Sequence, residues 1–403
     1  MKKSDFQSKF PGKLVKTEFL ESPDRALGEA QKVVCHSFLP DPLPPKVDWD
    51  QILLAHFQRH SDTLLALGKV NGLHRRVGNA AGLLRTLWMR EAKLSSEIEN
   101  IHTTAEGLVL AGAGRSQDIR ESSKESWNYV RALEHGIQSE LPWSVRIIRE
   151  MHSLLLNSVR GQKHRPGEFR NGGVYIGGKS RGVKHARFVP PPATDVPSLM
   201  HDLEKFVNSA HEKIPPLFAV ALTHYQFETI HPFSDGNGRI GRVLISRSLV
   251  KEGLLEHPVV YMSAYINDHR REYVDLLLRI SQEGGQAWSD WIGFILDAIR
   301  TQALDTIWRS EELITLKSHY HDLLKRDKAP PRLFPIVDDL FAVPALNVAD
   351  FMKQTDVVKT TAGKDIARLE KLGILREYTG RERERDWLAQ QIVDVITKEP
   401  PQK

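Results

Sequence analysis

Residues 231–242 read His231-Pro232-Phe233-Ser234-Asp235-Gly236-Asn237-Gly238-Arg239-Ile240-Gly241-Arg242. The glycines on either side of Asn237 let the backbone turn sharply and direct successive N–H groups toward one anion. The apolar run that follows, from Ile240 to Ile245, is compatible with a helix. A turn at a helix N-terminus also gains from the helix dipole, which favours phosphate. This segment therefore predicts a phosphate-binding turn that opens into a helix.

The charged side chains of the same segment indicate what the turn does. Asp235 can hold a divalent cation through its hard carboxylate oxygens, as magnesium on a nucleotide requires. Arg239 and Arg242 are three residues apart, so both can reach along a phosphate chain. His231 is the one side chain of the segment whose ordinary pKa lies near neutrality. A glycine-rich turn alone commonly does no more than cap a helix, but these residue types together predict phosphoryl transfer.

The segment resembles the signature of the Fic family, HPFx(D/E)GNGRxxR, and matches it at every specified position. The residues that lead into it are also typical of that family: His224, Tyr225, Phe227 and Glu228. The resemblance covers roughly residues 44–287, with a weaker match in the tail. It implies an all-helical enzyme that transfers AMP from ATP to a hydroxyl group of a protein.

The resemblance also implies a role for each matched position. His231 would be the general base that deprotonates the target hydroxyl, and Asp235 would bind Mg²⁺. Phe233 would point into the core and fix the loop. The phosphate ligands would be the cradle residues Gly236, Asn237 and Gly238, and the arginines Arg239 and Arg242, which would contact the β- and γ-phosphates.

A second segment, Ser95-Ser96-Glu97-Ile98-Glu99-Asn100, lies N-terminal to the signature. By itself it is an ordinary helical stretch with acidic residues outward. Beside the signature it is similar to the inhibitory motif (S/T)xxxE(G/N) of one class of the family, with Ser95, Glu99 and Asn100 at the specified positions. The resemblance implies that Glu99 pairs with Arg242 in the place of the γ-phosphate. Such charges ~4 Å apart attract by about 4 kcal/mol at an effective dielectric of ~20, before desolvation. We therefore expect a self-inhibited enzyme.

Two further segments border the expected site. Val174, Tyr175 and Ile176 lie between glycine pairs and predict a short hairpin, which is either a surface hairpin of no special role or the family's flap. A flap would hold the target segment by strand addition beside His231. After the signature, Tyr265 and Asn267 resemble the segment that borders the adenosine pocket, although Tyr265 can equally be a core aromatic.

Composition sets the outer limits of the interpretation. The chain has 403 residues, a formal net charge of +5 and one cysteine, Cys35. The length allows two or three domains, and a lone cysteine fits a reducing compartment. The start of the chain lacks the apolar region of a signal peptide, and no apolar run approaches membrane-spanning length. The sequence thus predicts a cytoplasmic protein with no membrane partner.

The tail beyond the break Ala329-Pro330-Pro331 reads as a small winged helix-turn-helix. Asn347 begins a short helix, a second helix covers 360–372, and 374–378 begins the wing. The presumed recognition helix carries Lys364, Arg368 and Lys371 but also Asp365 and Glu370, and 381–385 alternates arginine with glutamate. A DNA-binding face is usually more uniformly basic. This pattern favours contact with a protein or dimerisation over DNA binding.

These observations predict a mainly α protein: a Fic-type helical bundle with a small β-hairpin flap, plus a C-terminal winged helix-turn-helix domain. The expected divisions are an extended, proline-containing segment (1–46), an N-terminal helical region (47–115), the catalytic core (116–300), a helical connector (301–328) and the winged domain (329–403). The expected partners are ATP and a protein with a Ser, Thr or Tyr hydroxyl, including the chain itself; a homodimer is left open. Two alternatives remain: a nucleotide-sensing transcription regulator, and removal of AMP or transfer of another phosphate-containing group on the same fold.

Overall fold

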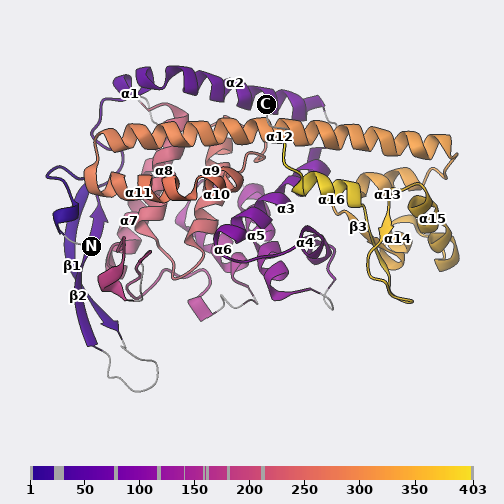
Figure 1. Cartoon of the computed structure of the whole chain (residues 1–403), viewed down its shortest axis with the longest axis horizontal. Helices are drawn as coiled ribbons and strands as arrows, with labels where there is room; N and C mark the ends of the chain where they lie inside the picture. The colour runs from indigo at the N-terminus through magenta and orange to yellow at the C-terminus, as the bar shows by residue number, and fades with distance from the viewer. Residues whose placement is uncertain are drawn as a thin grey trace. The chain divides into compact units, whose positions relative to one another are not determined.

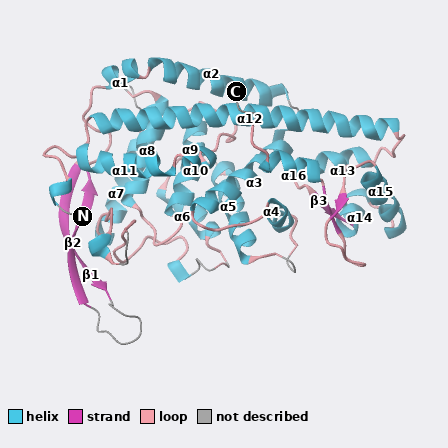
Figure 2. Cartoon of the chain, in the orientation of Figure 1, coloured by secondary structure: helices cyan, strands magenta, loops and turns pink. Residues whose placement is uncertain are grey.

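The computed structural model describes residues 3–21, 31–76, 80–115, 119–139, 141–157, 159, 163–178, 182–209 and 214–400. Helices dominate these ranges and strands are few (Figure 2), as predicted. None of the helices described there combines the length and the apolar character that crossing a membrane requires.

The chain folds as two compact units that do not follow the order of the sequence. The first comprises Met1–Leu65 and Arg131–Arg300, and the second comprises Ala66–Val130 and Thr301–Lys403. This division differs from the expected linear one, because residues 66–130 belong with the tail rather than with a separate N-terminal region. The helices α2 (Phe57–Arg76), α5 (Glu121–Gln138) and α12 (Gln286–Arg326) contribute residues to both units.

The first unit contains the signature segment. Its helices, besides parts of α2, α5 and α12, are α1 (Trp49–Ala55), α6 (Val145–Leu155), α7 (Val196–Asn208), α8 (Pro216–Ile230), α9 (Asn237–Lys251), α10 (Ser263–Asp268) and α11 (Arg270–Glu283). The 3-10 helices with described bounds in this unit are η1 (Lys3–Asp5), η3 (Val183–His185) and η4 (Ala193–Asp195). Helix α8 is buried on nearly every side. The indole N–H of Trp291 on α12 donates to the Ala221 carbonyl of α8 at 2.9 Å, so α8 is the centre of this unit.

The N-terminal segment is an antiparallel pair of strands, β1 (Gly12–Glu21) and β2 (Gln31–Pro40), which lie side by side in Figure 1. The expected proline-containing extended segment is therefore paired along ten residues of each strand. Phe19 and Cys35 are buried in a small apolar cluster with Val189, and the Phe38 N–H donates to the Val189 carbonyl at 2.9 Å. The strands thus pack against the segment that follows the predicted flap.

The second unit holds helices α3 (Ala80–Ile98) and α4 (Ala105–Gly112) together with the tail. Helix α3 packs against α13 (Leu333–Leu340) and α16 (Gln390–Thr397). The Thr86 hydroxyl donates to the Phe341 carbonyl, and Arg90 pairs with Asp305 of α12 at 3.4 Å. The middle of α3 is therefore fixed by elements that lie more than 200 residues further along the chain.

The tail has the element order of the predicted winged helix. After α13 come β3 (Ala345–Asn347), α14 (Val348–Thr355), α15 (Lys359–Lys371), β4 (Arg376–Glu377) and β5 (Asp386–Leu388). The strands form one antiparallel sheet in the order β3-β5-β4. The Asn347 side chain caps α14 by accepting from the Asp350 N–H at 2.8 Å, which confirms the predicted helix start.

Candidate active site

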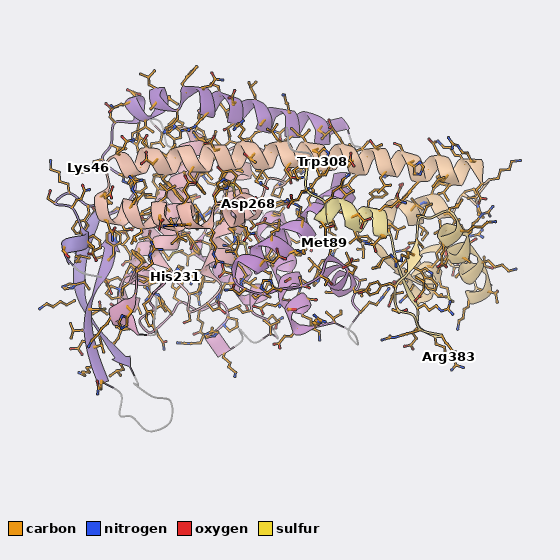
Figure 3. The ribbon with its side chains drawn as sticks, in the orientation of Figure 1. Lys46, Met89, His231, Asp268, Trp308 and Arg383 are labelled. Carbon is orange, nitrogen blue, oxygen red and sulfur yellow. The ribbon has the colours of Figure 1, made fainter. Side chains whose placement is uncertain are left out.

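Helix α8 ends at His231, whose backbone is left-handed with φ 51° and ψ 60°. Its N–H still donates to the Phe227 carbonyl at 3.0 Å, so His231 closes the last turn of the helix. A left-handed non-glycine residue is uncommon and is retained where the surroundings hold it. This conformation turns the chain out of α8, and it places the half-buried imidazole (labelled in Figure 3) at the start of the signature loop.

The hydrogen bonding of the imidazole selects one tautomer. Nδ1 of His231 lies 3.3 Å from the Glu228 carbonyl oxygen, which can only accept. Nδ1 therefore carries the proton, and the lone pair is on Nε2. The role of His231 as a base stays a prediction.

Helix α9 begins at Gly236, with φ 80° and ψ 4°, and no described side chain caps it. The first helical hydrogen bond runs from the Ile240 N–H to the Gly236 carbonyl at 3.0 Å, so the preceding N–H groups of Asn237 and Gly238 point out of the helix end. A Cβ atom at Gly236 would meet Leu155 at 3.1 Å, besides the unfavourable φ. The predicted turn that opens into a helix is confirmed. Its binding of phosphate stays a prediction.

The side chain of Asn237 holds the loop closed. Its Oδ1 accepts from the Phe233 N–H and its Nδ2 donates to the Phe233 carbonyl, both at 2.8 Å. Phe233 is fully buried, which confirms the expectation that it points into the core. Any contact of Asn237 with phosphate would therefore come from its backbone N–H rather than from its amide.

Asp235 offers one carboxylate at the mouth of the turn, and its side chain is 41% exposed. Oδ1 accepts from the Gly236 N–H at 2.7 Å and lies 3.6 Å from Arg239 Nη2. These interactions engage Oδ1, which leaves Oδ2 for a cation. No cluster of three or more His, Cys, Asp or Glu side chains suited to a metal occurs among the described residues. A single carboxylate suits Mg²⁺ that takes its other ligands from water and substrate phosphates.

Arg239 and Arg242 are both buried on the first turns of α9. Arg239 is paired with Asp235 as noted above. Arg242 lies close enough to His224 that, after desolvation by burial, its charge is a further cause that lowers the pKa of that histidine, to about 3. His224 is therefore neutral at pH 7, and its Nε2 lies 2.9 Å from the Tyr273 hydroxyl. The contact of either guanidinium group with a phosphate stays a prediction.

The sequence interpretation missed His152, on α6. Its ring is buried, and its Nδ1 accepts from the Gly167 N–H at 2.9 Å. Nε2 therefore carries the proton and donates to the Asp235 carbonyl oxygen at 3.0 Å. Burial lowers the pKa of His152 to about 4, so it remains neutral near pH 7. His152 supports the loop and does not compete with His231 as a base. No pattern around His152 marks it in the sequence.

Arg170 is the second residue that was missed. Its guanidinium is buried beneath the loop, and all its hydrogen bonds are to backbone carbonyls. Burial lowers its pKa to about 10, so the group is charged at pH 7. Only its position between an aromatic residue and the glycine pair of the flap could have drawn attention to it.

The predicted flap is a minimal strand pair. Ile176 and Phe188 form one antiparallel bridge, in which the Ile176 N–H donates to the Phe188 carbonyl at 2.8 Å. Val174 is half-buried and Tyr175 is exposed, with its ring 6.4 Å from that of Phe19 on β1. A Cβ atom at Gly173 would lie 2.4 Å from Phe19, so glycine is required for this approach. The hairpin exists, and its role in holding a target stays a prediction.

The inhibitory segment ends α3 in the second unit. Ser95 is buried, and Glu99 follows directly after the helix. Asn100 has φ 59°, a left-handed conformation that asparagine and glycine adopt more easily than other residues. The geometry therefore explains why the last motif position is Gly or Asn. The pairing of Glu99 with Arg242 stays a prediction.

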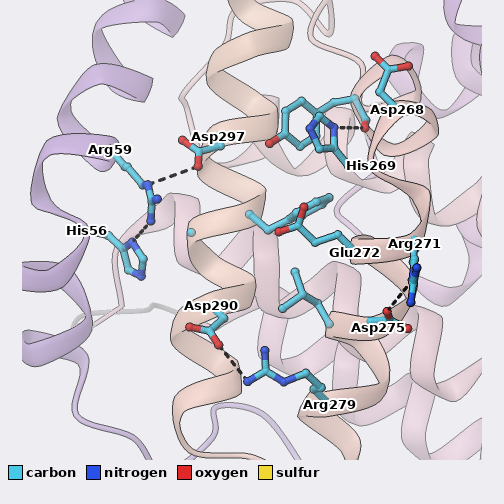
Figure 4. Close-up of a pocket in the computed structure, with 14 residues that line it drawn as sticks. His56, Arg59, Asp268, His269, Arg271, Glu272, Asp275, Arg279, Asp290 and Asp297 are labelled. Atoms are coloured by element: carbon cyan, nitrogen blue, oxygen red, sulfur yellow. Dashed lines mark hydrogen bonds and ion pairs between the residues drawn. The ribbon is translucent and has the colours of Figure 1, made fainter.

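Tyr265 faces a separate cavity of the first unit, shown in Figure 4. The cavity measures about 770 Å³ and is lined by His56 and by residues of α2, α10, α11 and α12. The Tyr265 ring stacks on His269 with centroids 4.0 Å apart, and Arg59 pairs with Asp297 across the cavity wall at 3.3 Å. No residue of 231–242 lines this cavity, and Asn267 is exposed outside it. The expected contact of Tyr265 and Asn267 with a nucleobase stays a prediction.

The structure is that of a mainly helical protein in which a histidine ends one helix and a glycine-containing turn opens the next. Residues 142–249 match the Fic/DOC family, and residues 57–138 match the Fic/DOC family N-terminal region. Residues 57–138 and 142–249 are thus similar to the two regions of the Fic/DOC family, in agreement with the signature at 231–242.

Individual relatives agree with this similarity. A protein of Aedes aegypti named protein adenylyltransferase Fic is 30% identical over 224 residues, which are 55% of this chain and 38% of that protein. Its namesake in Drosophila yakuba is 26% identical over 283 residues, 66% of this chain and 50% of that protein. The chain thus spans half or less of the length of these curated relatives. A Fic family protein from Desulfovibrio desulfuricans G20 shares the fold, with a TM-score of 0.51 and 22% identity over 82% of this chain and 95% of that chain.

Proposed function

We propose that this protein transfers AMP from ATP to a Ser, Thr or Tyr hydroxyl of a protein. The observation that carries the proposal is that His231 ends α8 directly before the turn that opens α9, whose N-terminus has no described side-chain cap. A base and an anion site at adjacent helix ends are the two requirements for attack of a hydroxyl on a phosphoryl group. The relatives named protein adenylyltransferase support the choice of AMP as the group transferred.

In the proposed reaction, the target hydroxyl loses its proton to Nε2 of His231 as its oxygen bonds to the α-phosphorus of ATP. The bond from the α-phosphorus to the bridging oxygen breaks, and pyrophosphate leaves. The N–H groups of Asn237 and Gly238 would bind the phosphates, while Arg239 and Arg242 would neutralise the leaving charge. When bound on Asp235 Oδ2, Mg²⁺ would supply further charge neutralisation.

Regulation by the N-terminal region is part of the same proposal. Glu99 would pair with Arg242 and exclude the γ-phosphate from its productive position, so that the resting enzyme is inhibited. The left-handed Asn100 and the buried Ser95 support this assignment, because they give the end of α3 one defined geometry. The single strand bridge at Ile176 and the exposure of Tyr175 support a target-holding role for Val174, Tyr175 and Ile176.

For the tail we propose a contact with protein, including a second copy of this chain, rather than with DNA. The guanidinium of Arg368, on the presumed recognition helix, pairs with Asp327, and its Nη2 donates to the Asp327 carbonyl at 2.8 Å. That arginine is therefore committed to an intramolecular contact. Lys364 and Lys371 remain exposed beside Glu370, which leaves a mixed surface.

The deciding experiment is mass spectrometry of the purified chain and of the Glu99→Gly variant after incubation with ATP and Mg²⁺. The proposal expects an added AMP on a hydroxyl side chain, and none in a matched His231→Ala sample. Addition of phosphate alone, or of UMP from UTP at a comparable rate, would contradict AMP transfer and would indicate another transfer reaction on the same fold. Sequence-specific, salt-sensitive binding to duplex DNA without any transfer would favour the transcription regulator.

A further inference from the structure

Arg170 joins three parts of the first unit through a single guanidinium that is only 3% exposed. Its Nε donates to the His231 carbonyl at 2.8 Å, and Nη2 donates to the Ile230 carbonyl at 3.3 Å. Nη2 also donates to the Pro191 carbonyl at 2.6 Å, and Nη1 to the Gly172 carbonyl at 3.2 Å. One side chain therefore holds the end of α8 and both sides of the flap.

The acceptors at Ile230 and His231 are carbonyls at the C-terminal end of α8. The last carbonyls of a helix have no partner within the helix and carry the negative end of its dipole. A buried cation is stabilised there without a carboxylate. The planar fork of arginine can bond several carbonyls at fixed angles, which a lysine ammonium cannot do.

The backbone of Arg170 adds a further link, because its N–H donates to the Pro232 carbonyl at 3.0 Å. Three consecutive carbonyls, at 230, 231 and 232, are thus bonded by one residue. These are the residues over which the chain leaves α8 in the left-handed conformation of His231. The direction of the imidazole follows from this backbone.

We infer that Arg170 is a positioning residue that fixes the His231 base and the flap in one mutual geometry. This inference rests on the proposed function. Arg170 acts through the backbone and touches no reacting atom. Because the flap would hold the target and His231 would deprotonate it, the guanidinium sets the distance between the hydroxyl and Nε2. The N-terminus of α9, where the phosphates would bind, makes no hydrogen bond with the Arg170 side chain.

The test uses the full-length chain carrying Glu99→Gly, with Arg170→Gln and Arg170→Lys compared in that background. The matched control is Arg146→Gln, an exposed arginine of α6 that pairs with Glu150. Automodification with α-labelled ATP is measured as a function of ATP concentration. We expect a maximal rate lowered about 10- to 100-fold by misplacement of the base, with the half-saturating ATP concentration changed less than about twofold. Arg170→Lys should keep the buried positive charge and remain folded, with a lower melting temperature, but should not recover the rate.

Amide hydrogen exchange gives a readout that is independent of activity. We expect faster exchange confined to residues near 230–233 and to the described flap in Arg170→Gln, and no change in Arg146→Gln. A parental rate in either Arg170 variant would overturn the inference, as would a rise in half-saturating ATP that accounts for the loss. Unfolding of both variants would make Arg170 a purely structural residue and overturn it as well. If the Glu99→Gly chain with Arg170 intact transfers no AMP at all, the proposed function fails, while the exchange data still decide whether Arg170 couples the flap to His231.

Discussion

The ring of His152 stacks on the ring of Phe233, with centroids 3.7 Å apart and planes 6° from parallel. His152 belongs to α6 and Phe233 to the signature loop, 81 positions later in the chain. The stack fixes the imidazole where it can donate to the Asp235 carbonyl and accept from the Gly167 N–H. The neutral side chain of His152 thus packs against the loop that follows His231 and hydrogen-bonds to it.

This support makes the fold sensitive to acid. The pKa of His152 is lowered by burial from 6.5 to about 4, and that of His224 to about 3. Above pH 6.5 both histidines are neutral in the folded and unfolded chains, so their contribution is complete. As the pH falls from 6.5 toward 4, His152 and His224 become protonated in the unfolded chain but stay neutral in the folded chain. We expect the free energy of unfolding to fall by about 1.4 kcal/mol per pH unit for each histidine.

Urea unfolding of the first unit between pH 7 and pH 5 measures this slope. His152→Leu should lower this slope by about 1.4 kcal/mol per pH unit, which corresponds to one proton. The variant will also be less stable at pH 7, because the Asp235 carbonyl and the Gly167 N–H lose their hydrogen-bond partner. An unchanged slope in His152→Leu would mean that His152 is already protonated in the folded chain or titrates normally.

His231→Ala removes the candidate base. We expect AMP transfer to fall by about 10²–10⁴, the range for a positioned acid or base. ATP binding, measured by calorimetry, should persist, because the N-terminus of α9 is built from other residues. A variant that labels its target at the parental rate would show that His231 is not the base.

Glu99→Gly should raise automodification, because Arg242 would then be available to the γ-phosphate. Arg242→Ala should not reproduce this gain, since it removes the phosphate contact together with the inhibitory pair. Labelling with α-labelled ATP compares the two variants with the parent. Equal labelling of the parent and Glu99→Gly would reject inhibition through Glu99. Loss of AMP removal in Glu99→Gly would point to the reverse reaction.

Asp235→Asn tests the metal with little change in shape. The amide keeps an oxygen that can accept from the Gly236 N–H but removes the charge that a divalent cation requires. We expect a higher Mg²⁺ requirement and a lower rate, with the melting temperature nearly unchanged. Transfer that persists in the parent after chelation of divalent ions would show that Asp235 serves the loop and not a metal.

Removal of residues 329–403 takes away α13 and α16, which pack against α3. The sequence alone suggests that such a chain keeps its automodification. The structure adds that α3, which carries Glu99 at its end, loses its packing partners. We therefore expect a folded, truncated chain to be more active than the parent.

Lys364→Glu in the full-length chain is the control for this truncation, because Lys364 is exposed on α15. It should leave the rate unchanged. A parental rate in a folded truncated chain would show that α3 does not depend on the tail. Complete loss of transfer in such a chain would mean that the tail completes the site.

The features that depend only on neighbouring residues could be predicted from the sequence. The glycines around Asn237 and the apolar run after them predicted the turn and helix of 236–251. Asn347 predicted the start of α14, and the glycine pairs around 174–176 predicted a strand pair. Turns, caps and helical periodicity are short-range properties, so a single segment contains the information.

Tertiary structure decided the features that join distant segments. The contact of His152 with the Asp235 carbonyl spans 83 positions, and that of Arg170 with the His231 carbonyl spans 61. Residues 66–130 share a unit with 301–403, and β1 packs on the flap through Phe19. Nothing local selects these partners, because a buried histidine or arginine looks like any other in the sequence. The role of such a side chain is set only in the folded protein, where it is buried and distant backbone groups form its hydrogen bonds.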